Sequence, residues 1–224
     1  MEVIVIILIV IVVILAYYLY RLSTKKNDTA SQLYYLNTPT IIGSDTLTNP
    51  KSARFSYTAW VFVNTWNIPT NTANMNKVLY KAQGGSPAQN IIELNLTSNK
   101  PILKTTVYND QIIITNNFPI QKWVYVVISV DSSTVDCYLD GKLIVSRKLN
   151  NIVTIPSTYA ITIGPNPLDT YITGFKYYDT PLNPQQVWSY YMAGNGYVGG
   201  KYTVNLEIKK DNKVITSFPP GSSS

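Results

Sequence analysis

The sequence predicts an all-β domain, an antiparallel β-sandwich, preceded by a single N-terminal transmembrane helix. Three observations lead to this expectation. The chain opens with an unbroken apolar run, short β-rich segments separated by turn signals follow from residue 54, and only one later segment has helical start and stop signals. Because no helices fall between the strands, a parallel α/β fold is excluded.

The apolar run extends from Val3 to Tyr20, and its 18 residues would span about 27 Å as a helix, close to the thickness of a bilayer core. A cleaved signal peptide is disfavoured, because Glu2 stands where a basic residue belongs and no small-residue cleavage site follows. The terminal tyrosines suit a membrane interface, and basic residues follow directly. We therefore expect an anchor over residues 1–21, carried by Val3, Ile7, Val10, Ile14, Tyr17, Tyr18, Tyr20 and Arg21.

The flanking charges predict the orientation of this anchor. Arg21, Lys25 and Lys26 follow the apolar run, whereas no basic side chain precedes it. The positive-inside rule then places the large domain on the cytosolic side. Asn27 and Asn95 begin glycosylation sequons, which would remain unused there, so glycans on them would contradict this orientation.

The rest of the chain divides into a polar, turn-rich linker over 22–53, a sandwich over 54–218 that includes a C-terminal hairpin, and a flexible tail over 219–224. Alternation and turn residues predict the strands. They are Phe55–Val63, Val78–Lys81, Ile91–Leu96, Ile102–Tyr108, Gln111–Thr115, Trp123–Asp131, Thr134–Leu139, Lys142–Lys148, Ala160–Ile163, Tyr171–Tyr178, Tyr202–Ile208 and Lys213–Phe218.

The clearest strand is Trp123–Asp131, whose even positions are all aliphatic and are therefore assigned to the core. Cys137 shares the core-facing parity of its own strand and is interpreted as an inert buried thiol. Asp140-Gly141 is a preferred type I′ hairpin turn, and Asn109-Asp110 is expected to join two other strands.

One helix is predicted after Leu182. Asn183 can cap it, Pro184 suits its first turn, and Gln186 completes a capping box. Gly194 or Gly196 is expected to end it. Its apolar side chains predict two pairs, Leu182 with Val187 as a hydrophobic staple and Trp188 with Tyr191 on one face.

The composition argues against most enzymes. The chain has no His, one Cys and three Glu, so His-based triads, His or Cys-cluster metal sites and most carboxylate pairs are excluded. The net charge is +6, but its basic residues form no stripe, so we expect no nucleic-acid partner.

Several motifs occur in a specific order. They are Phe55–Val61 (FSYTAWV), Pro119–Val127 (PIQKWVYVV), Val135–Leu143 (VDCYLDGKL), Gly174–Tyr178 (GFKYY) and Thr180–Val187 (TPLNPQQV). This set resembles the laminin-G-like, concanavalin A-like jelly roll of lectins and glucanases. The N-terminal apolar run together with PIQKW and LDGKL also resembles the membrane-anchored members found in nucleocytoplasmic large DNA viruses. That resemblance implies a virion protein of the viral inner membrane.

Glycanases of this fold carry two Glu and an Asp in the pattern Glu-x-Asp-x-x-Glu. Glu93 and Glu207 do not fit that pattern, and Thr173–Tyr178 has none of the acidic residues that calcium-binding relatives carry near this strand. Asp131, Asp136 and Asp140 are interpreted as turn formers and outward strand residues. We therefore expect no catalytic residues, no metal and no cofactor.

Aromatic side chains near loops and strand ends are the candidates for contact with a protein or a glycan. An equally simple interpretation is that they cover the edges of the sandwich. These candidates are Trp66, Tyr108, Tyr171 and Tyr197.

The leading hypothesis is a non-catalytic structural virion protein, a minor capsid or membrane–capsid linker protein. It would span the viral inner membrane once, with its domain on the capsid-facing side contacting capsid proteins. The alternative is an outward-facing membrane lectin that binds glycans during attachment. A degenerate glucanase is disfavoured because of the missing carboxylates.

Overall fold

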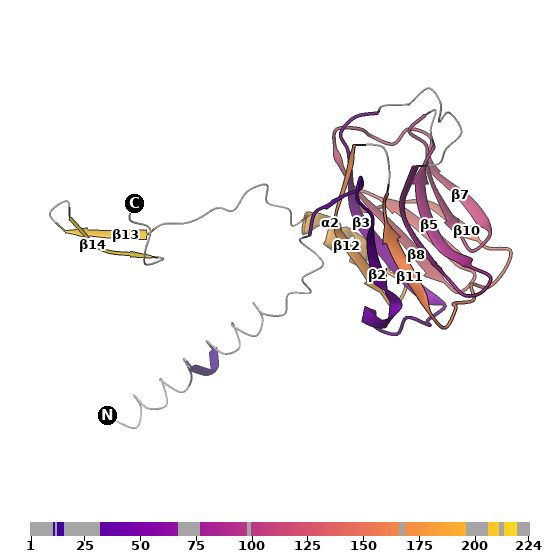
Figure 1. Cartoon of the computed structure of the whole chain (residues 1–224), viewed down its shortest axis with the longest axis horizontal. Helices are drawn as coiled ribbons and strands as arrows, with labels where there is room; N and C mark the ends of the chain where they lie inside the picture. The colour runs from indigo at the N-terminus through magenta and orange to yellow at the C-terminus, as the bar shows by residue number, and fades with distance from the viewer. Residues whose placement is uncertain are drawn as a thin grey trace.

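A computed structural model describes residues 32–66, 77–97, 100–165 and 169–195, with helical residues 11 and 13–15 and two strands at 206–210 and 213–218. Two antiparallel six-stranded sheets form the sandwich (Figure 1). The first has the order β1 (Tyr34–Tyr35), β12 (Thr170–Tyr178), β3 (Arg54–Val63), β8 (Trp123–Asp131), β9 (Thr134–Leu139), β10 (Lys142–Lys148). The second has the order β2 (Thr40–Gly43), β11 (Tyr159–Ile163), β4 (Lys77–Gly84), β5 (Gln89–Leu96), β6 (Leu103–Val107), β7 (Asp110–Thr115).

The all-β prediction is confirmed, and β8, β9 and β10 have the predicted bounds. The turn between β9 and β10 also has the predicted form. Asp140 and Gly141 both adopt positive φ angles, 47° and 79°, as a type I′ turn requires. Local alternation and turn chemistry therefore specify this part of the first sheet.

The main core lies between the two sheets, and the even positions of β8 point into it as predicted. The opposite face of β8 is buried as well, because a helix packs on the outside of the first sheet. Tyr125 and Val127 lie there in a second, smaller core. Its buried members are Trp60, Tyr125, Val127, Tyr138, Leu182 and Val187.

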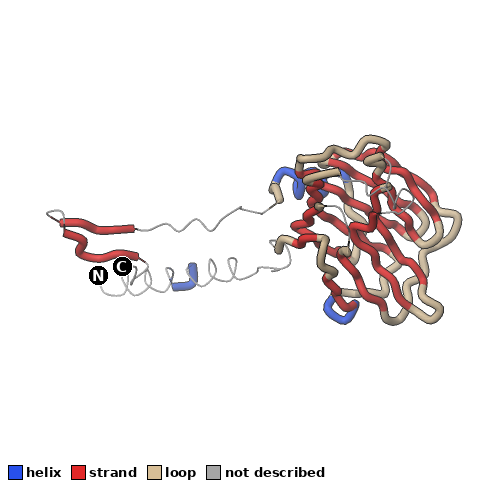
Figure 2. The backbone as a smooth tube through the Cα atoms, turned by 45° about the horizontal axis from the view of Figure 1, so that its top comes forward, coloured by secondary structure: helices blue, strands red, loops and turns tan. Residues whose placement is uncertain are grey.

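That helix is α2 (Pro184–Met192), which lies on the sandwich as shown in Figure 2. Its predicted capping box is present: the Gln186 backbone N–H donates to the Asn183 side chain at 2.9 Å, and the Asn183 N–H donates to the Gln186 side chain at 3.0 Å. Gly194 follows the helix with a φ of 77°, so it is the terminating glycine.

The sandwich begins earlier than the sequence predicted. Two strands, β1 and β2, and a short 3-10 helix, η2 (Ser44–Thr46), lie inside the segment expected to be a linker over 22–53. Leu36 in that segment is fully buried in the main core. The strands escaped prediction because two to four residues are too few to establish an alternating pattern.

The turn between β6 and β7 also differs from its prediction by one residue. Val107 pairs with Asp110, so Tyr108 and Asn109 form the turn instead of Asn109 and Asp110. The two C-terminal strands, β13 (Leu206–Lys210) and β14 (Lys213–Phe218), pair antiparallel as a hairpin.

Of the predicted anchor residues, only Ile14 is described, and it is helical. Within the described segments, no helix is long and apolar enough to cross a bilayer. The remaining predicted anchor residues lie outside the described residues: Val3, Ile7, Val10, Tyr17, Tyr18, Tyr20 and Arg21.

Candidate functional site

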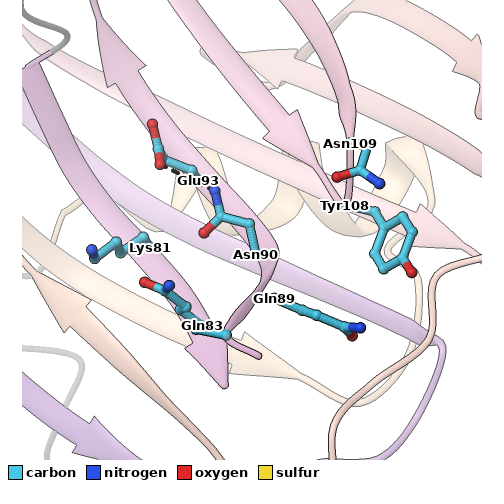
Figure 3. A pocket seen from close by; sticks show the side chains of 8 residues that line it. Lys81, Gln83, Gln89, Asn90, Glu93, Tyr108 and Asn109 are labelled. Atoms are coloured by element: carbon cyan, nitrogen blue, oxygen red, sulfur yellow. Dashed lines mark hydrogen bonds between the residues drawn. The ribbon is translucent and has the colours of Figure 1, made fainter. Parts of the chain in front are cut away.

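A polar hollow of about 520 Å³ lies on the outer face of the second sheet. Tyr80 and Ala82 of β4 point into the core. Lys81 and Gln83 alternate with them along the strand and therefore point outward. The same alternation on β5 turns Glu93 outward. The hollow is lined by Lys81, Gln83, Ala88, Gln89, Asn90, Glu93, Tyr108 and Asn109 (Figure 3).

Glu93 organises the hydrogen bonds of this hollow. Its Oε1 accepts a hydrogen bond from Asn95 Nδ2 at 2.7 Å, and its Oε2 accepts one from Asn90 Nδ2 at 3.2 Å. Lys81 lies opposite Glu93 in the β4–β5 register. No ion pair among the described residues includes Lys81. The ammonium group and the amides of Gln83 and Gln89 are therefore the groups that a ligand would meet.

Tyr108 brings an aromatic ring to the rim of the hollow from a strained backbone position. Its φ is 56°, in the left-handed region that favours glycine and costs an aromatic residue about 1–3 kcal/mol. The two-residue turn imposes this conformation, and the Tyr108 N–H donates to the Ile91 carbonyl at 3.0 Å.

The chemistry of the hollow suits binding better than hydrolysis. Amides, an ammonium and a tyrosine supply both hydrogen-bond donors and acceptors, which hydroxyl-rich ligands need. Glycoside hydrolysis normally uses two carboxyl groups across the scissile bond. Glu93 is the one carboxylate that lines this hollow, and both of its oxygens already orient amides.

The structure distributes the four predicted contact residues instead of gathering them. Tyr108 lines the hollow. Tyr171 lies in the first sheet and stacks on Tyr35 with ring centroids 4.9 Å apart. Trp66 is partly buried against the main core, which supports the simpler structural interpretation for it. Tyr197 lies outside the described residues.

Two of the three acidic residues singled out in the β8–β10 region, Asp131 and Asp140, have structural partners, whereas Asp136 Oδ1 is buried without a hydrogen-bond partner in the described part of the chain. Asp131 forms an ion pair with Arg54 at 2.8 Å. Asp140 accepts the Tyr125 N–H at 2.9 Å and pairs with Lys122 at 3.0 Å, which raises the pKa of Lys122. Over the described residues, no group of three acidic or sulfur side chains is placed to hold a metal ion.

Cys137 is buried in the main core. Burial, with a smaller contribution from the charge of Asp136, raises the pKa of its thiol to about 12. The thiol therefore stays protonated and unreactive at neutral pH.

The second sequon falls on a buried side chain. Asn95 is only 1% exposed, and its amide nitrogen is engaged by Glu93. A glycan is bulky and needs a surface position. The folded strand cannot accommodate a glycan on Asn95, so an unmodified Asn95 does not report the orientation of the domain.

Most residues that line the hollow were not predicted as contact residues from the sequence. Gln83, Gln89 and Asn90 are outward polar residues, which look the same in sequence whether they face solvent or a site. The available signal was partial: Glu93 has the parity opposite to Ile92, Leu94 and Leu96 in its predicted strand, but Lys81 shares the parity of Leu79. Lys81 faces outward because the β4–β5 register shifts between Val78 and Tyr80.

The chain belongs to the concanavalin A-like lectin/glucanases superfamily, because the model of that family (Laminin_G_3) matches residues 35–188. This match includes β2, which the sequence-based linker had placed outside the sandwich. No curated protein matches the sequence.

Solved structures share the fold at low sequence identity. A sialidase of Trypanosoma rangeli, solved in complex with sialic acid, aligns with a TM-score of 0.51 at 18% identity, over 64% of this chain and 24% of its own. The binding domain of botulinum neurotoxin serotype D aligns with a TM-score of 0.54 at 15% identity, over 72% of this chain and 42% of its own. This chain thus corresponds to less than half of either protein.

Proposed function

We propose that this chain is a membrane-anchored, non-catalytic binding protein whose sandwich binds the hydroxyl groups of a glycan. The observation that carries the proposal is the hollow on β4 and β5, where amides and an ammonium surround an aromatic rim residue held at a strained φ. Membership of a lectin-containing superfamily supports the same ligand class.

The anchor in this proposal rests on the sequence. The apolar run from Val3 to Tyr20 is long enough to cross a bilayer, and Arg21 with the two following lysines forms a basic flank. These charges favour a cytosolic domain, as the structural virion candidate requires, whereas a lectin used in attachment requires an outward-facing domain, so the orientation separates the two candidate functions.

The glycan proposal is tested with the full chain in detergent or nanodiscs, by screening immobilised glycans and then titrating the best ligand. Tyr108→Gly removes the aromatic rim but relieves the positive φ. We expect it to remain folded and to bind about tenfold more weakly, equivalent to about 1.4 kcal/mol.

The matched control is Gln121→Gly, because Gln121 also has a φ of 56° and lies outside the lining of the hollow. It should leave glycan binding unchanged. Wild-type protein that binds no glycan, or Tyr108→Gly protein that binds as well as wild type, would contradict the proposal.

A second candidate function, that of a structural virion protein in contact with capsid proteins, is favoured by the open edge of β10. Among the described strands, β10 pairs with β9 alone, and Leu143 and Ile144 are 48% and 46% exposed. An open edge with exposed aliphatic residues is a template for a partner strand or an apolar contact.

Replacement of Ile144 by Lys should weaken retention of the protein by capsid shells without unfolding the domain. Ile113→Lys on β7 is the control, because Ile113 is 49% exposed on the edge of the other sheet. Equal retention of wild-type and Ile144→Lys protein would remove this candidate.

A further inference from the structure

The outer face of α2 exposes two large apolar side chains at the end of the sandwich where the described domain begins and ends. Trp188 is 46% exposed and Met192 is 65% exposed. Val187, about 100° around the helix from Trp188, is fully buried in the second core. The ring of Trp188 also packs against Gly141 and Tyr191, so the open face consists of Met192 and the exposed part of Trp188.

Both ends of the described domain meet at α2. Gln32, the first residue of the described segment that contains β1, lines one hollow together with Tyr190 of α2. Asn195, the last residue of the described segment that contains α2, lines another hollow with Tyr190. Figures 1 and 2 show α2 at one end of the sandwich. Both chain ends therefore leave the sandwich beside this helix.

The distance to the proposed anchor is limited by the chain itself. Residues 21–31 connect the apolar run to Gln32, and eleven residues span at most about 40 Å when fully extended. The α2 side of the sandwich is therefore held within about 40 Å of the proposed anchor, near enough for α2 to reach the membrane surface. Lys176 lines both of these hollows and Asp179 lines one of them, so the excess positive charge on this side comes from the basic flank of the anchor.

We propose that the exposed face of α2, formed by Trp188 and Met192, docks into the interface of the lipid bilayer that holds the anchor. Tryptophan combines an apolar ring with an N–H donor, which suits the boundary between headgroups and acyl chains. Basic residues beside such a face favour anionic headgroups. The inference rests on the proposed anchor, but not on either candidate ligand.

The test uses the full chain reconstituted into phosphatidylcholine–phosphatidylserine vesicles whose acyl chains carry bromine, a short-range quencher of tryptophan fluorescence. We expect part of the wild-type fluorescence to be quenched. Trp188→Phe should lose that quenched component, whereas Trp66→Phe should retain it. Equal quenching in wild-type and Trp188→Phe protein would overturn the docking.

A second variant keeps the reporter in place. Met192→Glu should reduce the quenching of Trp188 by adding a charge to the docking face. Ile152→Glu is the matched control, because Ile152 is also 65% exposed. Ile152 is next to Val153, whose N–H donates to the Ser132 carbonyl in the β8–β9 turn. That turn lies at the opposite end of β9 from Gly141, which packs against Trp188. Quenching unchanged by Met192→Glu would contradict the proposal.

Flotation of the chain with vesicles distinguishes the docking of α2 from the membrane anchor. A chain that floats with vesicles but leaves Trp188 unquenched contradicts the docking and preserves the anchor. A chain that does not float with vesicles contradicts both.

Discussion

The hydroxyl groups of two buried serines form hydrogen bonds that hold the segment before α2 on the first sheet. Ser56 and Ser129 face each other across β3 and β8 with their oxygens 3.2 Å apart. The Leu182 N–H donates to both, at 3.0 Å and 2.9 Å. Ser56 in turn donates to the Thr180 carbonyl at 2.9 Å. A single backbone N–H thus has two alternative acceptors inside the protein.

Either acceptor alone can satisfy that N–H, so the two serines should not act additively. We expect Ser56→Ala and Ser129→Ala each to lower the free energy of unfolding by about 1 kcal/mol, and the double variant to lower it by more than the sum. The double variant leaves the Leu182 N–H buried without a partner. Denaturant unfolding of the four proteins measures the coupling, with exposed Ser146→Ala as a control that should change little. Strict additivity would contradict this account.

At the scale of elements, α2 packs closely on the β9–β10 turn because Gly141 in that turn has no side chain. A Cβ added to Gly141 would lie 2.7 Å from a ring carbon of Trp188 and 3.2 Å from Tyr191. Glycine is therefore required at position 141 for two reasons. The backbone has a positive φ, and the ring of Trp188 occupies the space that a Cβ would need. The turn that ends β9 consequently also positions the helix that covers β8.

Gly194 separates these two requirements experimentally. Its φ of 77° matches that of Gly141, but nothing lies within 4 Å of an added Cβ. Gly194→Ala should cost about 1–2 kcal/mol for the backbone alone. Gly141→Ala should cost more and should shift the tryptophan emission, because Trp188 must move. Equal losses of stability in the two variants would show that the helix contact contributes nothing.

At the scale of the whole molecule, the domain encloses many ionisable groups in their neutral forms. Burial raises the pKa values of Tyr125 and Tyr138 to about 12, and that of Tyr80 further. The thiol of Cys137 is shifted in the same direction. The tyrosines that fill the two cores therefore make the fold sensitive to alkali.

The sign of this sensitivity follows from proton binding. Above the ordinary pKa values of 9.0 for Cys and 10.0 for Tyr, the unfolded chain loses protons that the folded chain retains up to about pH 12. The free energy of unfolding must then fall as pH rises through that window. We expect buried tyrosines to ionise together with loss of circular dichroism before pH 12. Ionisation of these tyrosines ahead of unfolding would contradict the burial.

How far the sequence predicts this molecule depends on the range of the interactions involved. Local alternation and an Asp-Gly turn suffice for β8 to β10, and a capping box suffices for the start of α2. The burial of Tyr125 and Val127 could not be predicted, because their cover comes from a helix about 60 residues later in the chain. The glycine requirement at Gly141 has the same long-range origin.

The candidate site was predicted less well than the fold. Tyr108 was expected as a contact residue, but its amide-bearing neighbours were not. Their side chains come from two strands and a turn, and only the β4–β5 and β5–β6 registers bring them together. Register between hairpins is set by bulges and turns that leave little trace in the sequence.

The position of both chain ends beside α2 has a mechanical consequence. Tension applied to the chain before Gln32 would reach the sandwich at β1, where Tyr34 and Tyr35 are the two residues paired with β12. Such a strand peels from its neighbour one residue at a time, whereas the long β3–β8 pair would have to shear as a unit. A modest pull would therefore release β1 first, leaving the nine-residue strand β12 as a fresh edge while the rest of the sandwich stays folded.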